Sequence, residues 1–300
     1  QLPALLVERA EPPGRHPQMG ATFLNLNRNK RSIVLDLKSP DDMAVLADLL
    51  ASADVFVCNV RPQSLRKLGL DYPSLAARHP RLIYCGAYGF SERGPYAGRP
   101  AYDDIIQAMS GLAHLQGANN GGVPSYVNTI VADKITGLTL TASIAMALYE
   151  RERSGLGQAI EVPMFETMVA FNLVEHLSGA TFVPGAGDMG YDRVLSEHRR
   201  PYRTRDGFIG LLPYTNNHWL SLFRRVGRDD LAEHPHFRDA PSRARHVDEV
   251  YGVLADLVAQ RSTQEWIDLL SDCDIPFTPV KSLTDLLDDP HLRAVGFFHE

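Results

Sequence analysis

The sequence predicts an α/β protein with a parallel sheet, followed by a smaller α+β unit. Across residues 32–177, β-branched apolar runs alternate with apolar residues at helical spacing, which is typical of βαβ units. Between Gly179 and Arg200 this periodicity is lost and glycine and proline accumulate, which indicates a linker. A second series of short strands and helices begins at Pro201. We therefore expect a large domain over 1–183, a linker over 184–200 and a small α+β domain over 201–288.

The expected large domain carries strand and helix signals in alternation. A β-branched run predicts a strand over 32–37. Ser39 predicts a helix cap, because Pro40 stands at the first helical position and Asp41 and Asp42 follow in the first turn. Further strands are expected at 5–8, 54–59, 82–88 and 159–164, and further helices at 63–68, 101–112, 133–153 and 165–177.

The expected small domain is marked by equally local signals. Ser262 and Glu265 have the spacing of a capping box, which predicts a helix that continues over 266–270. Strands are expected at 208–212 and 277–280, and further helices at 217–226 and 246–260.

Composition excludes several classes of protein. With 44% apolar and 22% charged residues, the 300-residue chain is expected to fold around a core. A net charge of −6 disfavours a basic surface that binds nucleic acid. Cys58, Cys85 and Cys273 are odd in number and far apart, so no disulfide framework or zinc-finger spacing is present. This cysteine usage favours a reducing cytoplasm.

The sequence gives no signal for a membrane span or a secretory leader. The longest apolar stretch, 137–149, is interrupted by Thr139, Thr141 and Ser143, and so falls short of the roughly 18 residues that a span needs. No signal peptide is visible. The chain opens without a methionine and ends without a polar tail, so we expect a fragment.

Two patterns that often mark ligand sites are weak in this sequence. Residues 185–190 match G-x-G-x-x-G, but Pro184 precedes them and neither a strand nor a clear helix flanks them, so a linker is favoured over a dinucleotide site. His234 and His236 flank Pro235, but no third metal ligand is evident from the sequence. We favour loop packing for this pair and predict no metal site.

Asp133 is the strongest candidate for chemistry. It stands between an apolar entry and the apolar helix expected at 133–153. One interpretation is a structural N-cap. The other is a carboxylate kept ionised by the helix N-terminus and able to attack an activated acyl group. The residues alone leave both interpretations open.

Several stretches together resemble the class III coenzyme A transferases, the CaiB/BaiF family, which includes formyl-CoA transferase, carnitine CoA-transferase and α-methylacyl-CoA racemase. The resemblance implies a Rossmann-like large domain that binds CoA, a small domain, a return linker that starts at 289–300, and two interlocked chains. It also implies that segments are missing at both ends, the front segment of the large domain among them. The matching stretches are 24–38, 53–62, 80–84, 94–96, 107–111, 131–137, 150–158, 201–207 and 289–290.

The resemblance implies a role for Asp133 and a position for Tyr102. Asp133 matches the family nucleophile, which forms an aspartyl anhydride and then an aspartyl-CoA thioester. The backbone N–H groups at the start of its helix are expected to supply part of the oxyanion stabilisation. Tyr102 matches a tyrosine near the acyl group, although an ordinary core aromatic is the alternative.

The resemblance also implies contacts to CoA. Arg9, Lys38 and Lys67 match basic contacts, and Asn59 with Val60 matches the loop on the adenine side. Basic side chains suit the nucleotide phosphates, but each could instead be a solvated surface charge. CoA is expected as a substrate, with no permanently bound cofactor.

Departures from the family pattern narrow the expected activity. The base positions of the racemases hold Tyr102 and Asn216, neither of which is a good base near neutral pH. Residues 195–200 replace the glycine-rich loop of formyl-CoA transferase, and Arg199 and Arg200 there are candidates to face a dicarboxylate acceptor. We therefore expect a cytoplasmic CoA-transferase that acts on an acyl-CoA and a carboxylic acid, forms an interlocked homodimer and binds neither nucleic acid nor membrane. A 2-methylacyl-CoA racemase and a non-catalytic CoA-binding relative remain the alternatives.

Overall fold

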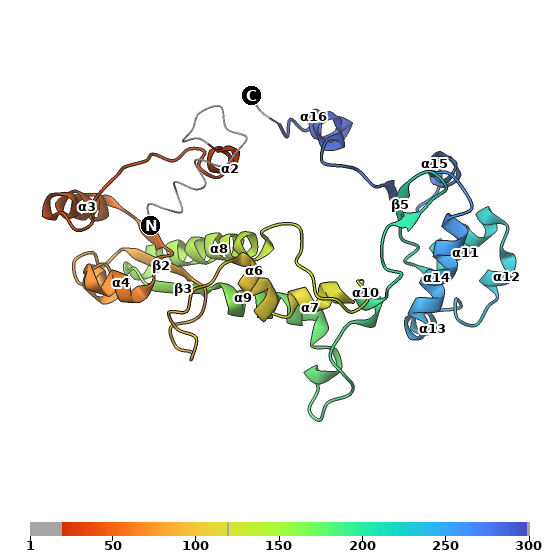
Figure 1. Cartoon of the computed structure of the whole chain (residues 1–300), viewed down its shortest axis with the longest axis horizontal. Helices are drawn as coiled ribbons and strands as arrows, with labels where there is room; N and C mark the ends of the chain where they lie inside the picture. Colours follow the sequence, from red (N-terminus) through yellow and green to blue (C-terminus); the bar gives the residue numbers. More distant parts are fainter. Residues whose placement is uncertain (1–19, 119, 299–300) are drawn as a thin grey trace.

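The computed structural model describes residues 20–118 and 120–298, and the first part of the chain is built on a parallel sheet (Figure 1). The strands β1 (Val55–Cys58), β2 (Ile83–Tyr88) and β3 (Ala159–Pro163) lie in the order β1-β2-β3. Val55 pairs with Ile83, and Tyr84 pairs with Ala159, both in parallel register. The predicted parallel sheet is confirmed, and the carboxyl ends of β1 and β2 meet at one edge.

Helices precede, connect and follow these strands. Ser39 caps the predicted helix as expected, because its hydroxyl accepts the backbone N–H of Asp42 at 3.4 Å. Long crossover connections that contain helices are what parallel strands require. The helices are α2 (Ala21–Leu26), α3 (Pro40–Ser52), α4 (Pro62–Lys67), α5 (Tyr72–Ala76), α6 (Asp103–Met109), α7 (Leu112–Gly117), α8 (Val131–Ser154) and α9 (Met164–His176).

Two local predictions are wrong, and one lies outside the described residues. The segment 32–37 forms no strand, because no strand of the described residues pairs with it, and its side chains Ile33 and Val34 are 59% and 76% exposed. The helix expected at 101–112 is divided into α6 and α7, because Gly111 adopts a left-handed φ of 85° that ends the first helix. The strand expected at 5–8 falls outside the described residues.

The long helix α8 runs against the direction of the strands. Near its carboxyl end, the buried Arg151 guanidinium binds the Asp54 carboxylate at 2.9 Å and the Arg81 carbonyl at 3.3 Å, just before β1 and β2 begin. Helix α8 rises by about 1.5 Å per residue, so its first turn lies roughly 27 Å along the axis from Arg151. This geometry places the first turn of α8, with Asp133, toward the carboxyl ends of the strands.

Helix α8 is also long and apolar enough to cross a membrane, with a mean hydropathy of 1.3 over an 18-residue window. That is weak evidence, since the core helices of other folds pass the same test. Here α8 packs against β2, β3, α6 and α9.

The second part of the chain combines short strands and helices, as the α+β prediction implies, and its strands form an antiparallel sheet. Tyr202 pairs with Ile209, and Gly210 pairs with Thr278. The capping box of Ser262 and Glu265 is confirmed in both of its hydrogen bonds. The elements are β4 (Tyr202–Arg203), β5 (Phe208–Leu211), α11 (Asn216–Val226), α12 (Asp229–Ala232), α13 (Ala240–Arg245), α14 (Val247–Val258), α15 (Thr263–Leu270) and β6 (Phe277–Pro279).

Among the described residues, the second part of the chain buries one hydrophobic cluster and the first part buries two. In the second part, the fully buried Trp266 and Phe223 pack with Leu254 between the sheet and the helices. In the first part, Ile106 of α6, Ala132 of α8 and Met168 of α9 belong to one cluster and are all fully buried. Packing of this cluster fixes the start of α8 against α6.

The segment between the two parts contains little regular structure, and the linker over 184–200 stays a prediction. It holds η1 (Ser178–Thr181) and α10 (Asp192–Leu195). The glycine motif at 185–190 follows no strand and precedes only the four-residue α10, so it lacks the context of a dinucleotide site. After β6 come η2 (Asp285–Asp288) and α16 (Pro290–Ala294), and Figure 1 shows α16 leaving the second part of the chain.

Candidate active site

The start of α8 is held by a buried carboxylate from a distant helix. Asp103, the first residue of α6, is only 6% exposed. Its Oδ1 accepts the backbone N–H groups of Ala132 at 2.7 Å and of Asp133 at 3.1 Å. These are two of the N–H groups that an α-helix leaves without an intrahelical partner. Asp103 therefore caps α8 from outside and fixes the backbone from which the Asp133 side chain projects.

Gln107 completes this support. Its amide Nε2 donates to Asp103 Oδ2 at 2.6 Å, and its Oε1 accepts the backbone N–H of Val127 at 2.9 Å. Both side chains are buried, so the hydrogen bonds are shielded from water. The Asp103 and Gln107 pair thus ties α6 to the loop before α8 and to α8 itself.

Asp133 is not the N-cap of its helix. The N-cap is Ile130, and Asp133 lies in the first turn with an exposed side chain. The expectation that the first N–H groups of α8 stabilise an oxyanion is wrong as well. The N–H of Val131 binds the Thr129 carbonyl at 2.8 Å, and those of Ala132 and Asp133 bind Asp103. The structural cap of α8 is therefore Asp103.

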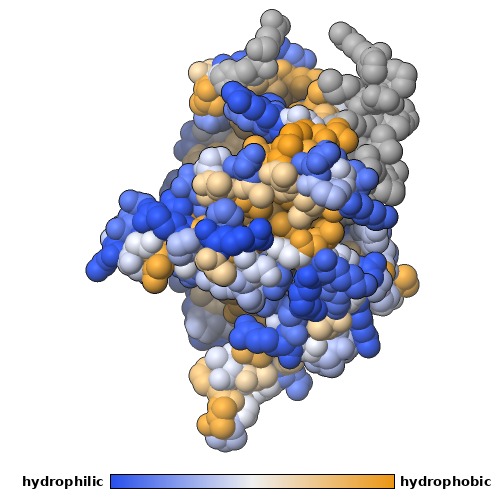
Figure 2. Space-filling model, turned by 90° about the vertical axis from the view of Figure 1, so that its left-hand side faces the viewer, coloured by the Kyte–Doolittle hydropathy of each residue, from blue (hydrophilic) through white to orange (hydrophobic). Residues whose placement is uncertain are grey.

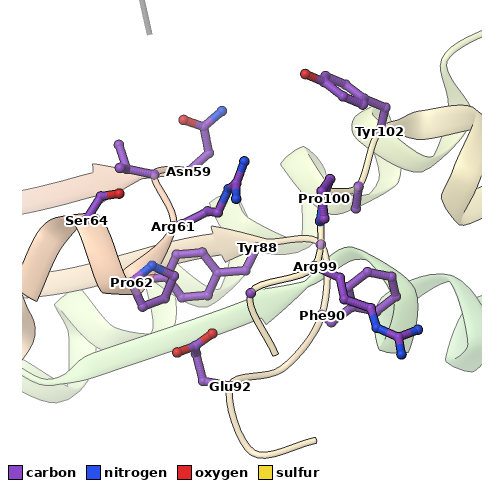
Figure 3. A pocket seen from close by; sticks show the side chains of 14 residues that line it. Asn59, Arg61, Pro62, Ser64, Tyr88, Phe90, Glu92, Arg99, Pro100 and Tyr102 are labelled. Atoms are coloured by element: carbon purple, nitrogen blue, oxygen red, sulfur yellow. The ribbon is translucent and has the colours of Figure 1, made fainter. Parts of the chain in front are cut away.

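A pocket of about 720 Å³ opens at the carboxyl ends of β1 and β2 (Figure 3). This volume lies within the range of small-molecule and cofactor sites, and ligands of parallel α/β sheets bind at this edge. The lining includes Asn59, Val60, Arg61, Tyr88, Arg99 and Tyr102.

The lining joins three of the predicted residues. Asn59 and Val60 follow β1 directly and line the pocket. Tyr102, which is 77% exposed, lies across the pocket from Asn59 (Figure 3). Tyr102 is the residue immediately before Asp103, and Asp103 holds the backbone of Asp133. The pocket and the first turn of α8 are therefore connected through Tyr102, its peptide bond to Asp103, and the hydrogen bonds that Asp103 accepts from α8.

The sequence interpretation missed two cations in this pocket. Arg61 and Arg99 both line it and both have exposed side chains. The Arg99 guanidinium lies 4.4 Å from the centre of the Tyr96 ring, a cation–π contact that positions the guanidinium itself. Arg61 belongs to a stretch that carries the family resemblance and directly follows Asn59 and Val60. Its position in the sequence could therefore have identified it as a contact to CoA.

The other predicted contacts are more scattered. Lys67 is exposed on α4, and Lys38 is exposed before α3; neither belongs to the pocket lining. Arg9 lies outside the described residues. Arg199 and Arg200 line a second pocket of about 560 Å³, together with Arg193. The structure therefore places Arg199 and Arg200 in one pocket and Tyr102 in another.

The two buried thiols are poor alternatives to Asp133 as a nucleophile. Burial raises the pKa of the Cys58 thiol, and burial raises the pKa of Cys85 to about 11. Both thiols therefore remain protonated near neutral pH, and the thiolate is the reactive form. Tyr88 on the pocket wall also stays neutral, since burial raises its pKa to about 12.

The histidine pair has a third neighbour that the sequence did not reveal. His234, His236 and Glu249 bring three donor atoms within 4.8 Å of one another. Glu249 reaches the pair from α14 and supplies a third donor atom that the sequence did not make evident, while the absence of a metal site stays a prediction.

The fold and the pocket define an α/β protein with a ligand site at the carboxyl edge of a parallel sheet. The chain belongs to CoA-transferase family III, whose profile matches residues 7–300. It is 31% identical over 279 residues to the acetyl-CoA:oxalate CoA-transferase of Acetobacter aceti, covering 91% of this chain and 70% of that protein. It is 32% identical over 280 residues to the succinate–glutarate CoA-transferase of Agrobacterium fabrum, covering 90% and 67%.

Other relatives agree in sequence and in fold. An acyl-CoA transferase of Fusarium pseudograminearum is 32% identical over 272 residues. That match covers 91% of this chain but only 59% of the relative, so the chain spans less than two thirds of that protein. The crystal structure of a CaiB/BaiF family protein from Brucella suis superposes with a TM-score of 0.78 at 28% identity, covering 97% of this chain and 77% of that one.

Proposed function

We propose that the protein transfers coenzyme A from an acyl-CoA to a carboxylic acid, with the Asp133 carboxylate as nucleophile. The observation that carries the proposal is the pair of adjacent residues Tyr102 and Asp103. Tyr102 lines the pocket at the carboxyl edge of the sheet, and Asp103 accepts a hydrogen bond from the backbone of Asp133 in the first turn of α8. The names of the relatives, which are CoA-transferases for several acids, support the same reaction.

The reaction proceeds through four acyl exchanges on one carboxylate. The Asp133 carboxylate attacks the thioester carbonyl of the donor, which gives a mixed anhydride and releases CoA thiolate. The thiolate attacks the aspartyl carbonyl, which gives an aspartyl-CoA thioester and releases the donor acid. The acceptor carboxylate attacks this thioester and releases the thiolate again, leaving a second anhydride. The thiolate then attacks the acceptor carbonyl, so the new acyl-CoA leaves and the carboxylate is restored.

The surroundings of Asp133 suit this role. Its position in the first turn of a 24-residue helix favours the ionised form, because the helix dipole is positive there. Asp103 holds the backbone in place without contacting the reacting atoms, so it acts as a positioning residue. Donors for the oxyanions come from groups other than the first N–H groups of α8, which are already bonded.

The pocket is proposed to hold the CoA portion. Asn59 and Val60 form its adenine side, Tyr102 lies near the acyl group, and Arg61 and Arg99 face the phosphates. Arg9, Lys38 and Lys67 remain proposed outer contacts. The acyl-CoA is a substrate, and we propose no permanently bound cofactor.

Arg61→Ala and Arg99→Ala are each expected to raise the KM for the acyl-CoA about tenfold, because each removes a charge-assisted contact to a phosphate. The kcat is expected to change little. Steady-state kinetics at varied acyl-CoA concentration measures both values. Arg93→Ala is the matched control, since Arg93 is exposed on the same loop but does not line the pocket. An unchanged KM in both pocket variants contradicts the proposal that Arg61 and Arg99 bind the phosphates of CoA.

The acceptor is proposed to be a dicarboxylate that meets Arg199 and Arg200. Both arginines line a pocket with a third cation, Arg193. Tyr202 and Leu211 line the same pocket and give it an apolar wall. Several relatives are named for dicarboxylic acids, such as oxalate and glutarate. The variant Arg199→Glu/Arg200→Glu tests the assignment, and unchanged acceptor selectivity in it contradicts the assignment.

The two alternatives have less support. A racemase needs bases at Tyr102 and Asn216, and the Asn216 amide oxygen instead accepts a hydrogen bond from Arg243 at 2.6 Å. A non-catalytic CoA-binding relative has no need for Asp133 in the exposed first turn of α8. Solvent exchange of the α-proton of an acyl-CoA would favour the racemase.

Trapping of the intermediate tests the proposed reaction. The protein is incubated with a panel of acyl-CoAs and quenched with hydroxylamine, and its peptides are examined by mass spectrometry. An activated aspartyl group gives a hydroxamate at Asp133, and the most effective acyl-CoA indicates the donor. CoA binding without any adduct contradicts the proposal.

We further propose a cytoplasmic homodimer, interlocked as in the family resemblance. Helix α8 exposes Leu138, Met146 and Tyr149 on one face, with exposures of 73%, 65% and 68%. Figure 2 adds that hydrophobic residues also gather on the end of the molecule that carries α3 and α4. A second copy is proposed to cover such surface, and analytical ultracentrifugation tests the dimer.

A further inference from the structure

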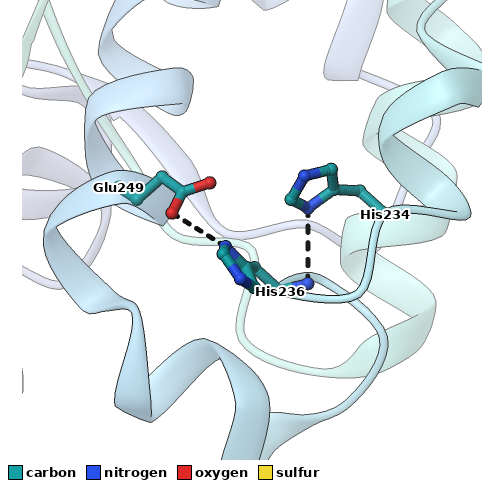
Figure 4. A group of neighbouring side chains, drawn as sticks. All are labelled: His234, His236 and Glu249. Atoms are coloured by element: carbon teal, nitrogen blue, oxygen red, sulfur yellow. Dashed lines mark hydrogen bonds and ion pairs between the residues drawn. The ribbon is translucent and has the colours of Figure 1, made fainter.

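The loop between α12 and α13 approaches α14 through three side chains that carry metal-binding atoms. His234 and His236 stand on the loop, and Glu249 stands on the first turn of α14 (Figure 4). One donor atom from each residue lies within 4.8 Å of the other two. Two imidazoles and one carboxylate are a common ligand set for zinc and for other divalent transition metals.

Two hydrogen bonds use the donor atoms of the cluster that a cation would bind. His236 Nδ1 and Glu249 Oε2 are 2.7 Å apart and joined by a hydrogen bond. His234 Nδ1 accepts the backbone N–H of His236 at 3.3 Å, a long hydrogen bond that is easily exchanged. Two zinc ligands are about 3.3 Å apart in a tetrahedral site, so small rotations of these side chains suffice to close around an ion. Metal binding would displace the proton between His236 and Glu249.

The surroundings hold the two histidines close to this geometry. The His246 ring stacks on the His236 ring at 3.6 Å with an interplanar angle of 10°, which restricts rotation of the His236 ring. The loop itself is anchored by Phe237, which is 4% exposed, and by the hydrogen bond from Arg243 to the Phe237 carbonyl at 2.8 Å. Pro235 further limits the backbone between the two histidines. A site with anchored ligands loses less entropy when it binds.

We propose that His234, His236 and Glu249 form a binding site for one divalent transition metal, with Zn²⁺ as the probe ion and water in the remaining position. The ion joins the loop between α12 and α13 to α14 and so braces this part of the chain. It takes no part in the transfer reaction, and the proposal is independent of the proposed function.

Zinc titration of the chelator-treated protein tests the site. Competition with a chromophoric chelator is expected to give about one Zn²⁺ per chain with a Kd of about 1 µM or below. His234→Gln/His236→Gln is expected to weaken this binding at least about 100-fold, because it removes two ligands. Zn²⁺ is also expected to raise the Tm of the unmodified protein and to leave the Tm of the double variant unchanged.

Matched variants keep the test decisive. His114→Gln/His291→Gln removes two exposed histidines elsewhere and is expected to bind Zn²⁺ like the unmodified protein. Glu249→Gln keeps the shape of the side chain and is expected to weaken Zn²⁺ binding about tenfold or more. This variant tests the site if the double variant fails to fold. The absence of saturable binding near one ion per chain overturns the proposal, and so does an equal loss in the control pair.

Discussion

Asp133→Asn is expected to lower the transferase kcat by at least about 10³-fold, because it removes the nucleophile on which all four acyl exchanges take place. Asparagine has nearly the shape of aspartate, and the side chain is exposed in the first turn of α8, so the fold is expected to persist. Binding of CoA, measured by calorimetry, is expected to stay within about threefold of the unmodified value, because the proposed CoA contacts line the pocket and Asp133 is not among its lining residues. Loss of kcat with retained binding is the signature of a group that acts on the reacting atoms.

The matched control is Asp104→Asn. Asp104 is also an exposed aspartate in the first turn of a helix, at α6, but nothing in the pocket depends on it. Activity of this variant is expected to be unchanged. An Asp133→Asn variant that retains a tenth or more of the kcat would remove the carboxylate from the mechanism. The hydroxamate experiment separates this outcome from a failure to find the right donor.

Most elements of the fold follow from local signals in the sequence. The cap at Ser39 and the capping box at Ser262 each act within a few residues, and each is confirmed. The strand predicted at 32–37 is wrong because a strand does not depend on local signals alone. A strand needs a partner, and β-branched residues by themselves do not supply one.

The candidate site was predictable only in part, because its supports come from distant parts of the chain. Asp133 was identified, but the two interpretations of it could not be separated without knowing that Asp103, 30 positions earlier, already caps the helix. Glu249 joins His234 and His236 for the same reason, from a different helix. Spacing in sequence carries no information about such contacts, whereas the packing of α6 on α8 and of α14 on the loop creates them.

Asp103→Ala is expected to destabilise the protein by about 3 kcal/mol, since it leaves several buried donors without an acceptor at once. The backbone N–H groups of Ala132 and Asp133 lose Oδ1, and the Gln107 amide loses Oδ2. Denaturant unfolding measures this loss. Asp104→Ala, on the exposed side of the same turn, is expected to change the free energy of unfolding by less than about 0.5 kcal/mol.

Asp103→Asn separates the positioning role from stability. The amide oxygen of asparagine can still accept the two N–H groups of α8, but its NH₂ group then faces the Gln107 Nε2, which is also a donor. Gln107 cannot simply turn its amide around, because its Oε1 already accepts the Val127 N–H. We therefore expect a loss of about 1–2 kcal/mol in stability and about a tenfold fall in kcat, with the KM for the acyl-CoA nearly unchanged. If kcat stays intact while stability falls, Asp103 only stabilises the fold, and the connection between the pocket and Asp133 has no catalytic consequence. If both fall together and the hydroxamate yield at Asp133 falls with them, the buried pair on α6 sets the position of the nucleophile on α8.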